Sequence, residues 1–171
     1  MTSAVGSATH ADEATTPRWT VVLAVVMTAV LEVLDSTIVN VALPYMQSTF
    51  GVSSDQTVWI VTSYIVASVA VMPLTGLLSR KLGRRRLIAS AIIGFAVFSM
   101  LCGLAASIEM MVACRLGQGF FGAFLIPLAQ SILFQSFPRE KRGQAMALFG
   151  LGVVVAPILG PSVGAFLTEN F

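Results

Sequence analysis

We predict from the sequence an all-α membrane protein whose chain crosses the bilayer about five times. Of its 171 residues, 56% are hydrophobic and only 11% are charged, whereas a soluble domain has about 25% charged residues. The charged residues are missing from five apolar runs, each near the ~20 residues that a helix needs to cross a bilayer. The basic residues cluster between these runs, as they do in the loops of a polytopic membrane protein.

The five predicted helices follow one another with short links. Their approximate limits are 19–44, 57–78, 87–107, 110–135 and 143–168. The links are polar at 45–56, strongly basic at 79–86, little more than a turn at 108–109, and basic again at 136–142. Residues 1–17 are small and polar, and we expect them to form a disordered tail before the transmembrane region 18–171. No basic segment precedes the first apolar run, so this run is better interpreted as a retained helix than as a cleaved signal peptide.

The positions of the basic residues predict the orientation of the chain. If the five helices alternate in direction, nine of the ten Lys and Arg residues fall on one side of the membrane. These nine residues are Arg18, Arg80, Lys81, Arg84, Arg85, Arg86, Arg139, Lys141 and Arg142. Because cytoplasmic loops carry the excess of Lys and Arg, we expect the N-terminus and its tail to be cytoplasmic.

Composition argues against several other classes of protein. The net charge of +2 is too small to indicate a nucleic-acid partner. Cys102 and Cys114 lie in apolar runs without the spacing of metal ligands, so we expect no metal site. His10 is the only histidine and lies in the tail, which excludes a histidine-based catalytic triad within this chain. An intramembrane enzyme with two acids remains as an alternative, but Asp35 is the only aspartate in any predicted helix; we therefore expect no enzyme.

Two acids in the first predicted helix, Glu32 and Asp35, and Arg115 in the fourth stand out within apolar surroundings. A charge at this depth costs at least ~2.5–3.5 kcal/mol and marks a functional site by default. The two acids are three residues apart and share one helical face, where carboxylates repel each other. We assign Asp35, Glu32 and Arg115 to proton coupling. The alternative is that both acids only solvate an aqueous cleft.

Depth counting predicts that Asp35 and Arg115 meet. Asp35 lies nine residues before Pro44, roughly 13 Å below the expected outer end of its helix at ~1.5 Å per residue. Arg115 lies five residues into the fourth predicted helix, roughly 8 Å deep by the same rise. The reach of an arginine side chain covers the difference. Such a pair either breaks when the acid is protonated or only holds two helices together.

Small and polar residues give the fourth and fifth helices distinct faces. Arg115, Gln118, Gly119 and Gly122 share one face of the fourth helix by their spacing, and the glycines allow close packing. We assign Gln118, together with Asn40 of the first helix, to the substrate pathway.

The fifth predicted helix has a small residue at every fourth position, which gives a flat surface for packing. These residues are Gly152, Ala156, Gly160 and Gly164. Pro157 and Pro161 form a neighbouring stripe that we expect to bend the helix. We assign these glycines and prolines to helix packing and gating, with the helix sealing one end of the pathway.

Five motifs in order resemble those of the fourteen-span drug:proton antiporters of the major facilitator superfamily. The motifs are LDSTIVNVALP (34–44), WIVTSY (59–64), GLLSRKLGRRR (76–86), RLGQGFFGA (115–123) and APILGPSVGA (156–165). In the third motif, Gly76, Gly83 and Arg84 match the loop shared by the whole superfamily, although Arg80 stands where that loop usually has an acid. The resemblance covers residues ~20 to 171, and Ala165 replaces the second glycine of a pair in the last motif.

The resemblance implies proton-driven efflux of amphiphilic compounds by alternating access, powered by the proton gradient without a cofactor. It implies a place in the cytoplasmic (inner) membrane, a role in multidrug or antibiotic resistance, and proton coupling by Asp35 and Arg115. The implied partners are the lipid bilayer, a small amphiphilic substrate and a periplasmic adaptor. The chain is then the incomplete N-terminal half of a transporter. Two alternatives stay open: an exporter of one dedicated metabolite, and a truncated membrane protein that does not transport.

Overall fold

The computed structural model describes residues 19–170, with side chains described for residues 22–166. The tail predicted at residues 1–17 lies outside this part of the chain. The elements are α1 (Trp19–Phe50), α2 (Ser54–Val71), η1 (Met72–Leu74), α3 (Thr75–Leu82), α4 (Arg84–Gly103), α5 (Ile108–Gly122), α6 (Leu125–Ser136), η2 (Arg139–Lys141) and α7 (Arg142–Asn170). All regular elements of the described residues are therefore helical, as predicted.

Five stretches of these helices are long and apolar enough to cross a membrane. They are Val22–Phe50, Ser54–Leu82, Arg84–Gly103, Ile108–Ser136 and Arg139–Phe166. Each overlaps one of the five predicted helices, so the predicted number and order of the spans are confirmed. Many large apolar side chains on these helices are exposed in the isolated chain, as expected of surfaces that face lipid or further protein.

The prediction that the first helix ends at Pro44 is wrong. α1 continues through Pro44 to Phe50, because one missing backbone donor does not by itself end a long helix. The helix ends where Gly51 adopts a φ of 64°, and the Val52 N–H donates to the carbonyl of Gln47 at 3.3 Å in the manner of a Schellman cap. Three residues then suffice for the turn, because Ser53 caps α2.

Two of the five spans contain an interruption that we did not predict. The second span changes from α2 to the short 3-10 turn η1 around Pro73 and then continues as α3. The fourth span is divided between α5 and α6 at Ala123 and Phe124. Pro127 lies four residues after Ala123, and a proline ring clashes with the carbonyl four residues before it. In contrast, α7 is one helix through Pro157 and Pro161.

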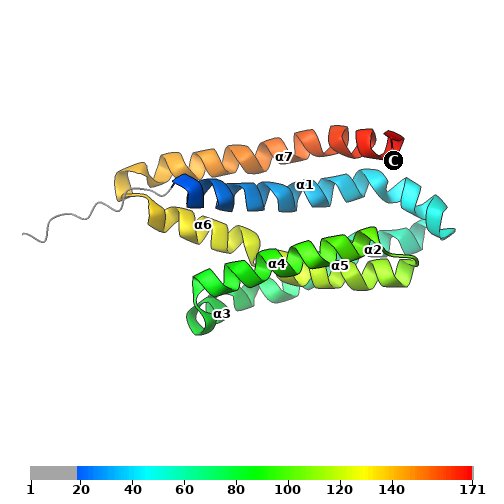
Figure 1. The fold of residues 1–171 in the computed structure, drawn as a ribbon, viewed down its shortest axis with the longest axis horizontal. Helices are drawn as coiled ribbons and strands as arrows, with labels where there is room; N and C mark the ends of the chain where they lie inside the picture. Colours follow the sequence, from blue (N-terminus) through cyan, green and yellow to red (C-terminus); the bar gives the residue numbers. More distant parts are fainter. Residues whose placement is uncertain (1–18, 171) are drawn as a thin grey trace, which may run out of the picture.

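The helices form two groups that position the polar residues between them. α1 packs along α7, while α5 packs between α2 and α4; Figure 1 shows these two groups as separate layers. α6 leaves the second group and packs against α1. Both basic turns, α3–α4 and η2–α7, lie at the same end of the molecule (Figure 1).

Candidate functional site

An ion pair between α1 and α5 lies at the centre of the polar residues. The Arg115 Nη1 atom is 2.8 Å from the Asp35 Oδ2 atom, so the predicted contact is confirmed. The Arg115 side chain is 4% exposed and the Asp35 side chain is 20% exposed. The pair is therefore largely removed from water, where attraction between unlike charges is stronger than at a surface.

Gln118 supports the arginine from one turn further along α5. Its Oε1 atom accepts a hydrogen bond of 2.7 Å from the same Nη1 atom of Arg115, and the Cys102 thiol of α4 donates to this oxygen at 3.8 Å. Gln118 is fully buried. In this conformation it is consequently a partner of Arg115, and its assignment to the substrate pathway stays a prediction.

Glu32 has a different partner from Asp35, although the two share a helix. The Tyr64 hydroxyl of α2 donates a hydrogen bond of 3.2 Å to Glu32 Oε1. Glu32 is 9% exposed, and its other carboxylate oxygen has no hydrogen-bond partner among the described residues. The structure thus separates the two acids into one site that contains a cation and another that contains a neutral hydroxyl.

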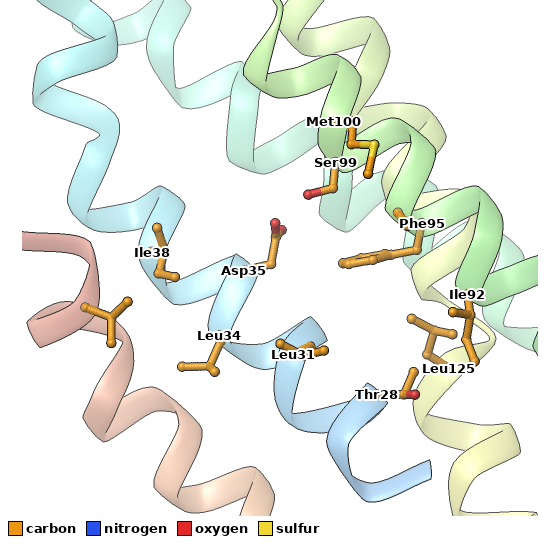
Figure 2. Close-up of a pocket in the computed structure, with 12 residues that line it drawn as sticks. Thr28, Leu31, Leu34, Asp35, Ile38, Ile92, Phe95, Ser99, Met100 and Leu125 are labelled. Carbon is orange, nitrogen blue, oxygen red and sulfur yellow. The ribbon is translucent and has the colours of Figure 1, made fainter. Parts of the chain in front are cut away.

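The Asp35 carboxylate also borders a cavity with a volume of about 540 Å³. Figure 2 shows Asp35 pointing from α1 toward Ser99 and Phe95 of α4 across this space. The remaining lining residues are Thr28, Leu31, Leu34, Ile38, Ile92, Ala96, Met100, Leu125 and Val163. The lining is apolar apart from Thr28, Asp35 and Ser99, which suits an amphiphilic occupant with one polar end.

A smaller cavity of about 130 Å³ lies between α1, α2 and α5. Its polar lining residues are Ser36, Asn40, Tyr64 and Arg115. Asn40 is exposed and lies on this cavity rather than on the larger one. Arg115 and Tyr64 thus border one common space, although they bind different acids.

Close approach of α2 to α5 depends on two glycines. A Cβ atom on Gly119 would collide with the backbone oxygen of Tyr64, and one on Gly122 would lie 2.7 Å from the Tyr64 hydroxyl. Ser68 fixes the same contact, because its hydroxyl donates to the carbonyl of Gly119 at 3.1 Å. The predicted common face of α5 is confirmed, since Arg115, Gln118, Gly119 and Gly122 are all buried.

The small residues of α7 face α1. A Cβ atom on Gly160 would collide with Thr37, one on Gly152 would lie 3.3 Å from Val30, and one on Gly164 would lie 3.4 Å from Val41. Ala156 is fully buried. The predicted packing stripe is confirmed, while Pro157 and Pro161 are exposed. Gating by α7 stays a prediction.

The loop residues Gly76, Gly83 and Arg84 differ in backbone conformation and in surroundings. Gly83 has a φ of 80° between α3 and α4, a conformation that favours glycine. Gly76 has no such strain, and no atom lies within 4 Å of the position that a Cβ would take. Arg84 is exposed. The described residues therefore show no contact that supports a packing role for Gly76 or a gating role for Arg84. Both roles stay predictions.

Sequence reasoning did not single out Tyr64 as a partner of Glu32. The signal was present, because a polar aromatic side chain in an apolar helix needs a hydrogen-bond partner when it is buried. Glu32 was the acid for which the sequence analysis had found no cationic partner.

Comparisons with known proteins identify the family. A family model described as Major Facilitator Superfamily matches residues 25–171. The chain belongs to the Major Facilitator Superfamily. Proteins of this superfamily are transporters, which agrees with the prediction that the chain is not an enzyme.

Curated relatives agree with the resemblance to multidrug exporters. The chain is 42% identical over 151 residues to the fatty acid resistance protein FarB of Neisseria gonorrhoeae, a match that covers 88% of this chain and 30% of FarB. It is 40% identical over 149 residues to the multidrug export protein EmrB of Escherichia coli (strain K12), covering 87% of this chain and 29% of EmrB. The chain spans about 30% of the length of these relatives.

A solved structure confirms the fold. The crystal structure of a bacterial homologue of the human lysosomal transporter Spinster, in an inward-facing and unoccupied conformation, matches with a TM-score of 0.74 and 26% identity. The match covers 84% of this chain and 30% of that one. The arrangement of the five spans is thus that of a major facilitator, a multi-pass membrane transporter.

Proposed function

We propose that the protein exports amphiphilic small molecules across the cytoplasmic membrane by alternating access, in exchange for protons. The observation that carries the proposal is the position of Asp35. Its carboxylate binds Arg115 on one side and borders an apolar cavity of about 540 Å³ on the other. One ionisable group therefore contacts both the buried cation and the space that suits an amphiphilic compound.

The coupling follows from the charge on Asp35. A proton on the carboxylate removes its negative charge and weakens the bond to Arg115, because the attraction between two opposite charges is lost and only a hydrogen bond from the cation to a neutral carboxyl group remains. Loss of the proton restores the pair. The energy source in this proposal is the proton gradient, and no cofactor takes part. Glu32 is the second acid, held by Tyr64 between α1 and α2.

Orientation is part of the proposal. The α3–α4 and η2–α7 turns contain eight basic residues at one end of the molecule, and an excess of Lys and Arg is typical of cytoplasmic loops. We place this end, and with it the N-terminus, in the cytoplasm. Such placement puts the α1–α2 and α4–α5 turns on the outer side, where a periplasmic adaptor of the kind implied by the resemblance would bind.

The substrate class is supported by the lining of the cavity and by the relatives. The relatives are named for multidrug export and fatty acid resistance, and both fit a space with apolar walls and few polar groups. Export of one dedicated class of compound is the second candidate. The fatty acid resistance relative favours it, because that name refers to a single chemical class.

Transport measurements test the proposal directly. The full-length protein in its own reading frame would be reconstituted in vesicles, and export of a fluorescent amphiphile would be followed with and without a pH gradient. We expect Asp35→Asn to lose transport driven by the pH gradient by at least about tenfold. Asp55→Asn, which changes an exposed acid in the first turn of α2, is the matched control and should retain it. Transport that Asp35→Asn leaves unchanged would contradict the role of Asp35.

A panel of compounds decides between the two candidates. Multidrug export predicts transport of chemically unrelated amphiphiles, whereas a dedicated exporter would transport one class, such as long-chain fatty acids. Each compound would be tested with Asp35→Asn as the coupling-deficient reference, so that leakage across the membrane is not counted as transport.

A further inference from the structure

Glu32 occupies a site in which Tyr64 is its one described hydrogen-bond partner. The carboxyl group is buried, its Oε1 atom accepts the Tyr64 hydroxyl at 3.2 Å, and its Oε2 atom has no hydrogen-bond partner among the described residues. The described hydrogen bonds of Arg115 go to Asp35 and Gln118 instead. The position of the Glu32 carboxyl group therefore depends on one tyrosine from a neighbouring helix.

The position of Tyr64 depends in turn on α5. Gly119 leaves room for the Tyr64 backbone, and Gly122 leaves room for its hydroxyl, since a Cβ on Gly122 would lie 2.7 Å from that oxygen. The hydrogen bond from Ser68 to the Gly119 carbonyl holds the two helices at this spacing. Three helices are thus linked in the order α5, α2, α1, ending at an acid that has no described hydrogen bond to Asp35 or Arg115.

We infer that Tyr64 is a positioning residue for proton coupling. Gly119 and Gly122 leave room for Tyr64, and its hydroxyl then holds Glu32 between α1 and α2 as a second proton-accepting group. The inference rests on the proposed function. Glu32 accepts a proton when its side of the site is open to the outside and releases it when the site opens to the cytoplasm. A proton on Glu32 changes its bond from Tyr64 and takes no hydrogen-bond partner from the Asp35–Arg115 pair.

The titratable groups around Glu32 are few, which distinguishes its role from theirs. On its own helix the nearest such group is Asp35, on α2 it is Tyr64, and on α5 it is Arg115. α6 contains no titratable side chain, and the described side chains of α7 include only Arg142, at the first position of that helix. Substitutions at Tyr64 and Gly122 remove none of these charged side chains, and the hydroxyl that they remove or displace is the one bonded to Glu32.

The experiment measures both the position of Glu32 and its effect on coupling in the full-length protein. Labelling of Glu32 by the lipophilic reagent dicyclohexylcarbodiimide would be quantified by mass spectrometry, with labelling of Asp35 in the same sample as an internal reference. Transport of a fluorescent amphiphile in vesicles would be measured under a pH gradient and, separately, down its own gradient. The variants are Tyr64→Phe, Gly122→Ala and Glu32→Gln. Gly150→Ala is the matched control, because no atom lies within 4 Å of its Cβ position.

We expect Tyr64→Phe to raise labelling of Glu32 at least about threefold relative to Asp35, because the hydroxyl that fixes the carboxyl group is gone. Transport driven by the pH gradient should fall about five- to tenfold, the size expected for one lost hydrogen bond, while downhill transport stays within about twofold. Gly122→Ala should repeat both effects by displacing the hydroxyl. In the Glu32→Gln background, Tyr64→Phe should cause no further loss, since both changes act through one group.

Other results overturn the inference. Unchanged labelling in Tyr64→Phe would mean that the hydroxyl does not position Glu32. Equal losses of driven and downhill transport would mean that Tyr64 serves only to hold the helices together. If the wild-type protein shows no transport driven by a pH gradient, the proposed function fails, whereas the labelling comparison still decides whether Tyr64 positions Glu32.

Discussion

The Nη1 atom of Arg115 lies 2.8 Å from the Oδ2 atom of Asp35, although 80 residues separate them in the chain. The bond joins α1, which packs along α7, to α5, which packs between α2 and α4. It is therefore a direct side-chain link between the two layers of the molecule (Figure 1). A proton that weakens this bond changes how firmly the layers are connected, which gives the pair a mechanical as well as an electrostatic role.

A charge swap tests whether this contact stabilises the fold. Asp35→Arg and Arg115→Asp each place two like charges together, and breaking a buried ion pair costs about 3–5 kcal/mol. We expect each single variant of the 171-residue chain in detergent to have a clearly lower melting temperature. The double variant should recover most of the loss. A double variant no more stable than the weaker single variant would show that the two side chains do not pair in solution.

Packing of α7 on α1 gives a second prediction. Gly160→Ala places a methyl group against Thr37, whose hydroxyl donates to the carbonyls of Val33 and Leu34 and holds the side chain in place. Overpacking of this kind costs about 1–3 kcal/mol, and thermal unfolding would measure it. Gly150→Ala has free space and should be neutral or slightly stabilising. Equal stability of the two variants would show that the small residues of α7 do not face α1.

The sequence predicted the five spans and the Asp35–Arg115 contact because both depend on simple regularities. Apolar runs of about 20 residues identify spans, and a constant rise per residue places charges at comparable depths. The depth count used the wrong end of α1, since the helix runs to Phe50 and extends about 9 Å further at this rise. The contact forms nevertheless, because the residues that lengthen α1 lie after Pro44 and do not change the position of Asp35 within the helix.

Other features depend on tertiary contacts that helical periodicity does not contain. Periodicity placed Gln118 on the same face as Arg115, but only the packing of the neighbouring helices on α5 shows that this face is buried. The structure also shows that Gln118 binds the arginine. Likewise, the bond from Tyr64 to Glu32 requires the spacing between α2 and α5 that Gly119 permits. Pro127 alone did not predict the interruption after α5, because α1 and α7 continue through Pro44, Pro157 and Pro161.

The two motif glycines of the basic loop should behave differently. Gly83→Ala forces a side chain into a conformation with a φ of 80°, which costs on the order of 1–3 kcal/mol. Gly76→Ala meets no neighbouring atom within the helix α3 and gains about 0.5–1 kcal/mol of helix propensity. Chemical or thermal unfolding of the 171-residue chain would compare the two variants. A loss of stability in Gly76→Ala as large as that in Gly83→Ala would contradict the separation of their roles.

The 171-residue chain expressed by itself should enter the membrane without exporting drugs. It spans about 30% of the length of its curated relatives, and the cavity beside Asp35, lined from α1, α4, α6 and α7, is partly open to the surroundings. The chain would be produced in a bacterial host that lacks its own efflux proteins, and growth in the presence of drugs would be recorded alongside the amount of protein in the membrane. The full-length protein in its own reading frame is the positive control. Drug resistance conferred by residues 1–171 at a normal membrane level would show that these five spans form a complete pathway, and the proposed mechanism would then need only the two layers described here.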